Sequence, residues 1–150
     1  MGFVRFEDLR VFQLAERLAD EIWDVVKNWN HFEKDTVGKQ LVRSADSIGA
    51  NIAEGAGRGT PADNRRFVRI ARGSLHETRY WLRRAYNRNL FDDSKIDSVR
   101  AILDELAPTL NAYLNSIGNP KHQTPNPKHK TPNTKHQTPN TKHQTPNTKN

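Results

Sequence analysis

One long stretch, residues 61–89, decides the fold, and it reads PADNRRFVRIARGSLHETRYWLRRAYNRN. Thr60 and Pro61 at its start are typical of a helix cap followed by the first helical position. Apolar residues then recur at the spacing of one helix side, namely Phe67, Val68, Ala71, Leu75, Leu82 and Ala85. The pattern predicts an amphipathic helix over about Pro61–Asn89, whose apolar side must pack against other helices.

Arginines follow the other side of this predicted helix. At about 100° per residue, the positions within about 40° of Arg65 are Arg69, Arg72, His76, Arg79 and Arg83. Residues 58–88 hold nine arginines and only two acids, Asp63 and Glu77. We interpret Arg65, Arg69, Arg72, Arg79 and Arg83 as a candidate nucleic-acid-binding stripe opposite the apolar side, because arginine has a permanent charge and a planar fork suited to phosphate. Tyr80 or Trp81 would add stacking.

The flanking sequence predicts three more amphipathic helices. We expect an N-terminal helix over about Asp8–Trp29, a second over about Lys34–Glu54, and a last one that begins near Asp92, kinks at Pro108 and ends at Gly118. No stretch shows the alternation of a strand. Four such helices with short links predict an all-α fold, an antiparallel four-helix bundle over residues 1–118.

A seven-residue repeat begins at Asn119, and residues 133–139 read NTKHQTP. The unit has no apolar side chain and contains proline, so we predict a disordered tail over residues 119–150. Three copies of the seven-base unit AACACCA translate into this same peptide, which indicates translated simple-sequence DNA. The alternative is a metal-binding or nucleic-acid-binding arm, because the tail repeats lysine and the histidines His122, His129, His136 and His143.

Charge is distributed unevenly between these two segments. The tail holds six of the 24 basic residues and no acid, so residues 1–118 carry 18 basic residues against all 17 acids. This near balance supports an alternative for the arginine stripe, in which acids of neighbouring helices or of another subunit neutralise it. The chain has no cysteine and no apolar run of the roughly 20 residues that span a membrane. We expect a cytoplasmic protein.

No catalytic constellation is present in the sequence, so we expect neither enzymatic activity nor a cofactor. His31 and His76, the two histidines before the tail, have no partner at metal-ligand spacing. Gly55, Gly57 and Gly59 precede no Gly-Lys-Ser/Thr, so they indicate a turn between two helices rather than a phosphate loop.

A polar group on the second predicted helix has two interpretations. Ser44, Asn51 and Glu54 lie near one face, where they would form a polar site at an oligomer axis. Alternatively, they make internal hydrogen bonds and stabilise the helix end, with Arg43 or Arg58 pairing with Glu54. We favour the second interpretation.

Three blocks in order resemble a known family. They are FEDLRVFQLA (6–15), QLVRSADSIGANIAEGAGR (40–58) and FVRIARGSLHE (67–77), and together they are similar to four-helix bundle proteins encoded in intervening sequences of bacterial 23S ribosomal RNA genes. The resemblance covers about residues 4–117. Within it, we take as family-motif residues Arg43, Ser44, Asn51, Glu54, Gly55 and Arg58. Pro108 departs from the family's usual continuous last helix.

The resemblance implies a bundle that is often a homopentamer. The chain is also similar to the accessory protein of diversity-generating retroelements, which implies RNA or DNA and a reverse transcriptase as partners. Two functions are therefore expected. One is a nucleic-acid-binding adaptor without base specificity, and the other is a self-assembling structural protein that uses the arginine stripe in subunit contacts. The small residues of the second predicted helix, together with three tryptophans in the chain, support assembly.

Truncation after Gly118 is expected to leave thermal stability unchanged, because the removed residues have no apolar groups with which to dock. The measurement is the thermal unfolding midpoint of the full and truncated chains. A drop of more than a few degrees would show that the tail packs on the bundle.

Overall fold

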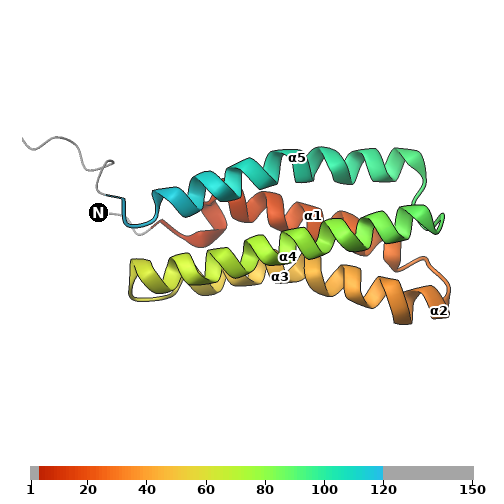
Figure 1. Ribbon diagram of the computed structural model, residues 1–150, viewed down its shortest axis with the longest axis horizontal. Coiled ribbons are helices and arrows are strands. Elements are labelled where there is room, and N and C mark those ends of the chain that lie inside the picture. Colours follow the sequence, from red (N-terminus) through yellow and green to blue (C-terminus); the bar gives the residue numbers. More distant parts are fainter. Residues whose placement is uncertain (1–3, 120–150) are drawn as a thin grey trace, which may run out of the picture.

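The computed structural model describes residues 4–119, and these form an antiparallel four-helix bundle (Figure 1). The described residues contain no strand. The long helices are α1 (Arg10–Val26), α3 (Lys39–Ala56), α4 (Pro61–Asn87) and α5 (Asp93–Ser116). The predicted fold class is thus confirmed, whereas the predicted tail lies, apart from Asn119, outside the described residues.

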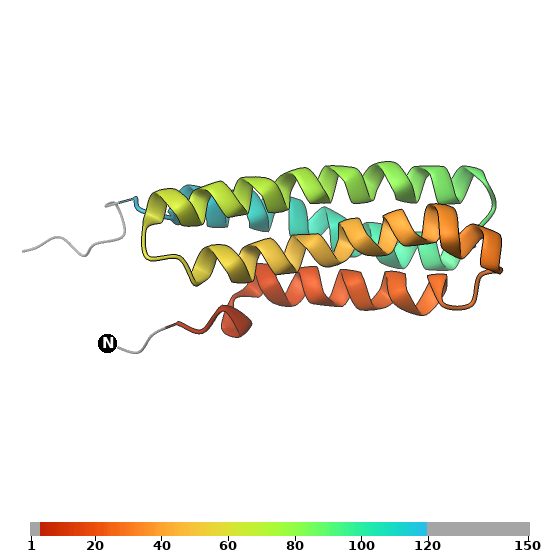
Figure 2. The ribbon, with the colours of Figure 1, turned by 90° about the horizontal axis from the view of Figure 1, so that it is seen from below.

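The four long helices form a closed ring. In that ring α1 packs against α3 and α5, and α4 packs against the same two helices. Figures 1 and 2 show successive helices running in opposite directions, so both ends of the described chain lie at the same pole of the bundle. Each helix contributes an apolar stripe to one central core, whose fully buried side chains include Leu18, Ile48, Val68 and Leu106.

The first two helices differ from their expected bounds. The N-terminal helix is shorter than predicted, because Asp8 belongs to a separate 3-10 turn, η1 (Phe6–Asp8), and α1 ends at Val26. Trp29 follows the helix and packs edge to face on Phe91, with ring centroids 5.8 Å apart. This aromatic pair covers the core at the pole where α4 turns into α5.

The second helix starts earlier than predicted and changes its pitch. It begins with α2 (His31–Glu33), widens into a π-helical turn, η2 (Lys34–Gly38), and continues as α3. A Cβ at Gly38 would lie 2.7 Å from Val26 Cγ1, so the backbone of this turn packs directly on α1. The spacing of apolar residues gives no sign of such a turn.

The cap predicted at Thr60 is present, and α5 begins with a similar cap at Asp92. Thr60 Oγ1 accepts a hydrogen bond from the Asp63 N–H at 3.2 Å, with Pro61 at the first helical position. Asp92 accepts one from the Lys95 N–H at 2.8 Å, and this bond lowers the pKa of the Asp92 carboxyl. Gly118 has a φ of +69°, the left-handed conformation expected just beyond the end of α5.

The end of α4 departs from expectation, whereas α5 continues through its internal proline. Asn89 has a φ of +58°, so α4 ends at Asn87, two residues early. The last helix runs unbroken from Asp93 to Ser116 through Pro108, which is exposed. Pro108 removes one N–H donor, the one that would bond the Asp104 carbonyl, but it does not end the helix.

The contact between α3 and α4 is the most extensive in the bundle and rests on small residues. A buried hydroxyl pair joins the two helices, because Thr78 Oγ1 lies 3.1 Å from Ser44 Oγ. One turn away, Ser74 Oγ lies 3.0 Å from Ser47 Oγ. Gly55 lies within α3 rather than in the turn after it, and it permits a close approach to α4.

A Gly55→Ala substitution is expected to destabilise the protein by about 1–3 kcal/mol, the usual cost of overpacking. The new Cβ would lie 3.0 Å from Phe67 Cβ and 3.1 Å from the Asn64 carbonyl oxygen, so α4 must shift. The measurement is denaturant unfolding.

Gly73→Ala is the matched control for that substitution. Gly73 is also inside a helix, but a Cβ there has no neighbour within 4 Å. It should stabilise by about 0.5–1 kcal/mol, since alanine favours the helical backbone. If both substitutions stabilise equally, the close α3/α4 approach does not constrain the fold.

Candidate nucleic-acid interface

The arginine stripe lies along the edge where α4 meets α5, not opposite the core as expected. Val68 is fully buried, yet it is only about 60° from Arg65 around the helix at 100° per residue. The buried side of α4 therefore borders the arginines directly. The prediction that the apolar residues and the arginines lie on opposite sides of the helix was wrong. Apolar residues at a spacing of three and four cover a broad arc of the helix surface, and this arc reaches the edge of the arginine stripe.

Arg65 is a structural residue in this arrangement. Its side chain is half-buried, and Nη1 donates a hydrogen bond to the carbonyl of Ile117 at 3.1 Å. That carbonyl belongs to the residue that caps the C-terminus of α5. A cation there also interacts favourably with the helix dipole. Arg65 thus ties the start of α4 to the end of α5.

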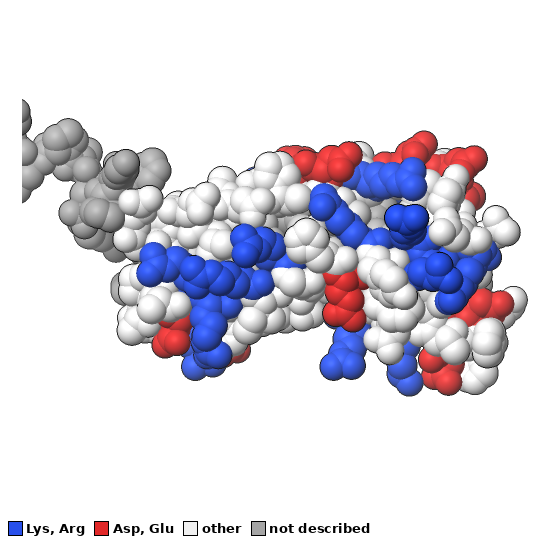
Figure 3. Space-filling model, in the orientation of Figure 1, with Lys and Arg blue, Asp and Glu red and all other residues white. Residues whose placement is uncertain are grey.

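The other four arginines of the stripe are exposed, and these are Arg69, Arg72, Arg79 and Arg83. Within residues 4–119, none of the four forms an ion pair with a carboxylate. Figure 3 shows basic side chains gathered over this face of the bundle, with acidic ones along its upper edge and in smaller groups at its centre and lower edge. The acids of neighbouring helices therefore leave the exposed arginines of the stripe uncompensated by direct contact within the described chain.

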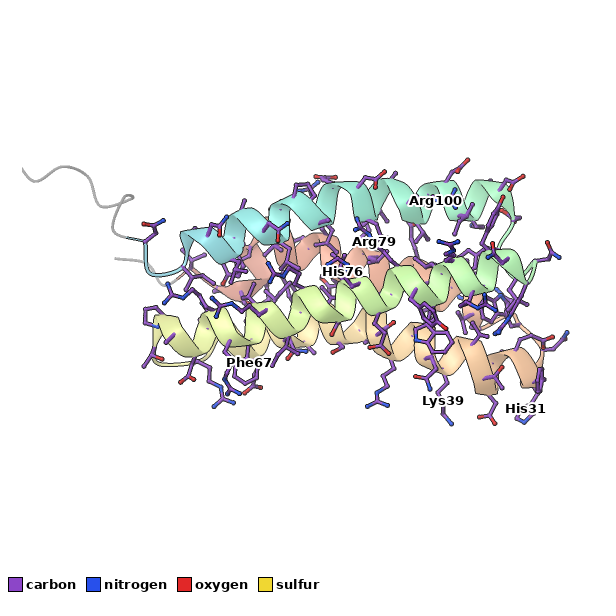
Figure 4. All side chains as sticks on the ribbon, in the orientation of Figure 1. His31, Lys39, Phe67, His76, Arg79 and Arg100 are labelled. Atoms are coloured by element: carbon purple, nitrogen blue, oxygen red, sulfur yellow. The ribbon has the colours of Figure 1, made fainter. Side chains whose placement is uncertain are left out.

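Two of these arginines line a groove between α4 and α5. The groove has a volume of about 340 Å³ and its charged lining residues are Arg79 and Arg83 from α4 and Arg100 and Asp104 from α5. Its apolar lining residues are Leu82, Ile96 and Leu103. Figure 4 shows Arg79 and Arg100 on facing sides of the junction between the two helices, with His76 close by on α4. Three guanidinium groups and one carboxylate therefore share one groove.

Arg100 is the functional candidate that the sequence did not reveal. Its guanidinium lies over the ring of Tyr86, 5.2 Å from the centroid, a cation–π contact that holds it beside α4. The Tyr86 hydroxyl donates to Asp93 Oδ1 at 3.0 Å, and this hydrogen bond raises the pKa of the tyrosine. The spacing argument that defined the stripe considers one helix at a time, so it could not include Arg100, which lies on α5.

The aromatic residues predicted to assist stacking differ in exposure. The Tyr80 side chain is 55% exposed, whereas Trp81 is half-buried against the core and its Nε1 lies 3.4 Å from Glu77 Oε1. Their rings pack edge to face with centroids 5.0 Å apart. Tyr80 is therefore the better placed of the two for contact with a ligand.

A larger groove lies on another side of the bundle, between α1 and α3. It has a volume of about 670 Å³ and is lined by the apolar Trp23, Val26 and Val42 and by the charged Lys27, Lys34, Lys39, Arg43 and Asp46. Trp23 is 57% exposed, an unusual state for so large an apolar side chain. Burial raises the pKa of Asp46, and the charge of Asp20 raises it further.

Comparison with protein families resolves what this bundle is related to. The sequence model of the 23S rRNA-intervening sequence protein family matches residues 7–112. The chain belongs to this family. The match spans most of the described bundle and takes in every exposed arginine of the stripe as well as both grooves.

A solved structure agrees with this family assignment. The protein is similar to a protein of unknown function from the S23 ribosomal protein family of Bacteroides thetaiotaomicron VPI-5482, with 26% identity and a TM-score of 0.65. The similarity covers 71% of this chain and 96% of the other. Comparison with curated proteins gives no match. The family assignment therefore brings a fold but no activity.

The family-motif residues of α3 make internal contacts. The buried Ser44 hydroxyl donates to the Leu41 carbonyl at 3.0 Å, and Asn51 Nδ2 donates to the Ser47 carbonyl at 2.8 Å. Glu54 forms an ion pair with Arg58, one of the two expected pairings. The other candidate, Arg43, is exposed and lines the α1/α3 groove. These contacts favour the structural interpretation of the polar group.

Two other kinds of feature are absent from the described residues. No group of three or more histidine, aspartate, glutamate or cysteine side chains within residues 4–119 is arranged to hold a metal ion. None of the helices in the same range has the length and apolar composition needed to cross a membrane.

Proposed function

We propose that this member of the 23S rRNA-intervening sequence protein family binds nucleic acid without base specificity, as an adaptor rather than an enzyme. The binding surface consists of Arg69, Arg72, Arg79 and Arg83 of α4, together with Arg100 of α5. The observation that carries the proposal is that the four exposed arginines of α4 lack an ion-pair partner among residues 4–119. Free guanidinium groups of this kind suit phosphate contacts.

The length of the surface also supports binding to a strand. At a rise of 1.5 Å per residue, Arg69 and Arg83 are separated by about 21 Å along α4. Successive phosphates of one strand of a duplex are about 3.4 Å apart along the axis, so the surface spans several of them. Because a row of guanidinium groups recognises the phosphate backbone and not the bases, little base preference is expected.

A second candidate function, self-assembly, is favoured by the apolar groove between α1 and α3. A second copy of the chain would cover Trp23, Val26 and Val42, and burial of such a patch stabilises a subunit interface. The resemblance favours a pentamer. It also favours a reverse transcriptase as a further partner. Assembly and nucleic-acid binding use different sides of the bundle, so the two proposals are compatible.

Replacing Arg69, Arg72, Arg79 and Arg83 by glutamine is expected to weaken binding to unrelated RNA and DNA sequences by a similar factor. The tail is removed first, because its six lysines would add binding of their own. The tailless parent should bind in roughly the micromolar range at low salt, and each arginine removed from a phosphate should reduce the salt slope by about 0.7–0.9. The measurement is fluorescence anisotropy at several salt concentrations. Arg65 is kept, because it stabilises the end of α5.

The control for this experiment changes the same number of charges elsewhere. Arg5, Arg10, Arg17 and Arg66 are exposed, line neither groove, and each already pairs with a nearby carboxylate, so their replacement should change binding less. If the tailless parent does not bind, the adaptor function is wrong. If the four substitutions on α4 break an oligomer instead, the arginines are subunit contacts.

Replacing Trp23 by serine is expected to lower the molecular mass in solution towards that of a monomer, because it removes the largest apolar group of the α1/α3 groove. Light scattering at micromolar concentration measures the mass. Tyr80→Ser is the matched control, since Tyr80 has nearly the same exposure, 55% against 57%, but lies outside the groove. A monomeric parent protein would contradict the assembly proposal directly.

A further inference from the structure

We propose that the groove between α4 and α5 binds a ribonucleotide unit, and that the protein therefore prefers RNA to DNA. This inference rests on the proposed nucleic-acid binding and specifies what one part of that surface recognises. The groove combines three arginines, one carboxylate and an apolar lining. None of these four charged groups is in an ion pair within residues 4–119, whereas Lys27 and Lys39 of the α1/α3 groove are paired. Each kind of group in the α4/α5 groove has a counterpart in a ribose phosphate.

The three guanidinium groups suit a phosphate. Arg79 and Arg83 are four residues apart on α4, so they lie on one face one turn apart. Arg100 faces them from α5 and is held beside that helix by the ring of Tyr86. A phosphate in the groove would thus be approached from both helices, an arrangement that a single helix cannot provide.

The apolar lining suits the carbon atoms of a sugar. Leu82 comes from α4, and Ile96 and Leu103 come from α5. All three are nearly buried, with exposures of 2–4%, so they form a surface at the base of the groove rather than projecting from it. The volume of about 340 Å³ corresponds to about eleven water molecules at roughly 30 Å³ each, a space that a sugar with its phosphate can enter.

Asp104 decides between RNA and DNA. Its carboxylate can only accept hydrogen bonds, and within residues 4–119 it forms no ion pair, although Arg100 is one turn away on the same helix. A phosphate alone would be repelled by this carboxylate. A ligand that brings a hydroxyl donor beside its phosphate avoids the repulsion, and the ribose 2′-hydroxyl is such a donor.

DNA lacks this donor, so the Asp104 carboxylate would lose hydration without gaining a hydrogen bond. A hydrogen bond to a charged group changes affinity by about tenfold or more. The exposed Arg69 and Arg72 line no part of the groove, and they contact phosphate equally well in RNA and DNA. The preference for RNA is therefore expected to come from the groove alone.

The test compares three oligouridylates of one length, carrying a 2′-hydroxyl, a 2′-fluoro or a 2′-deoxy group, with the full chain. The 2′-fluoro sugar keeps an RNA-like shape but has no hydrogen to donate. Uracil is common to all three, so no difference in the base enters the comparison. We expect the 2′-hydroxyl strand to bind about tenfold more tightly than both others.

Asp104→Ala should bring the three affinities together. Asp97→Ala is its matched control, because it removes the same charge from an exposed position of α5 that does not line the groove. Both variants lose one negative charge and should bind the 2′-fluoro and 2′-deoxy strands somewhat more tightly, but only Asp104→Ala should remove the extra affinity for the 2′-hydroxyl strand. Arg100→Gln should weaken all three strands while the RNA preference persists.

Each outcome of this test has a separate meaning. Equal binding of the three strands by the parent protein overturns the ribonucleotide site, and the four substitutions on α4 of the tailless chain then decide the adaptor function separately. A preference that survives Asp104→Ala likewise overturns the assignment of this groove. If no strand binds, the adaptor function itself fails. Circular dichroism of each variant checks that the helices are intact.

Discussion

The close approach of α3 and α4 is the constraint on which the rest of the bundle depends. Small residues along α3 let the two backbones come together, and at Gly55 even one methyl group would force a shift. The hydroxyl pairs between the helices, Thr78 with Ser44 and Ser74 with Ser47, add polar contacts that favour this rotation of α4 about its own axis. Ser44, Ser74 and Thr78 also lie within hydrogen-bond distance of carbonyls of their own helices, so the close packing at Gly55 sets the main cost of other rotations.

The rotation of α4 determines where its arginines lie. With its small side against α3 and its leucines towards the core, the arginines border α5. Arg65 consequently reaches the Ile117 carbonyl, while Arg79 and Arg83 meet Arg100 across a groove. The contact between α3 and α4 thus gives the arginines of α4 two roles. Arg65 holds the ends of two helices together, whereas the exposed arginines remain available to a ligand.

Most of the fold could be predicted from the sequence, and the candidate site only in part. The caps at Thr60 and Asp92 and the end at Gly118 follow from local chemistry, which acts over one turn and is visible in a single chain segment. The π-helical turn at Lys34–Gly38 was not predicted, because it depends on how its backbone meets Val26. Arg100 and Asp104 were missed for a similar reason, since the groove exists only when two helices are placed together.

Both ends of the described chain lie at the same pole of the bundle, and this has a practical consequence for protein engineering. The described chain enters and leaves the bundle at the pole where α3 turns into α4 (Figures 1 and 2). Arg83 lies about 33 Å along α4 from Pro61 at that pole, at 1.5 Å per residue. A fluorescent reporter or an immobilisation tag fused directly to either end of the described segment, residues 4–119, would therefore lie at the pole away from the groove of Arg79, Arg83 and Arg100. For the same reason, a circular permutation that joins the two ends and opens the loop between α4 and α5 would place new termini beside that groove.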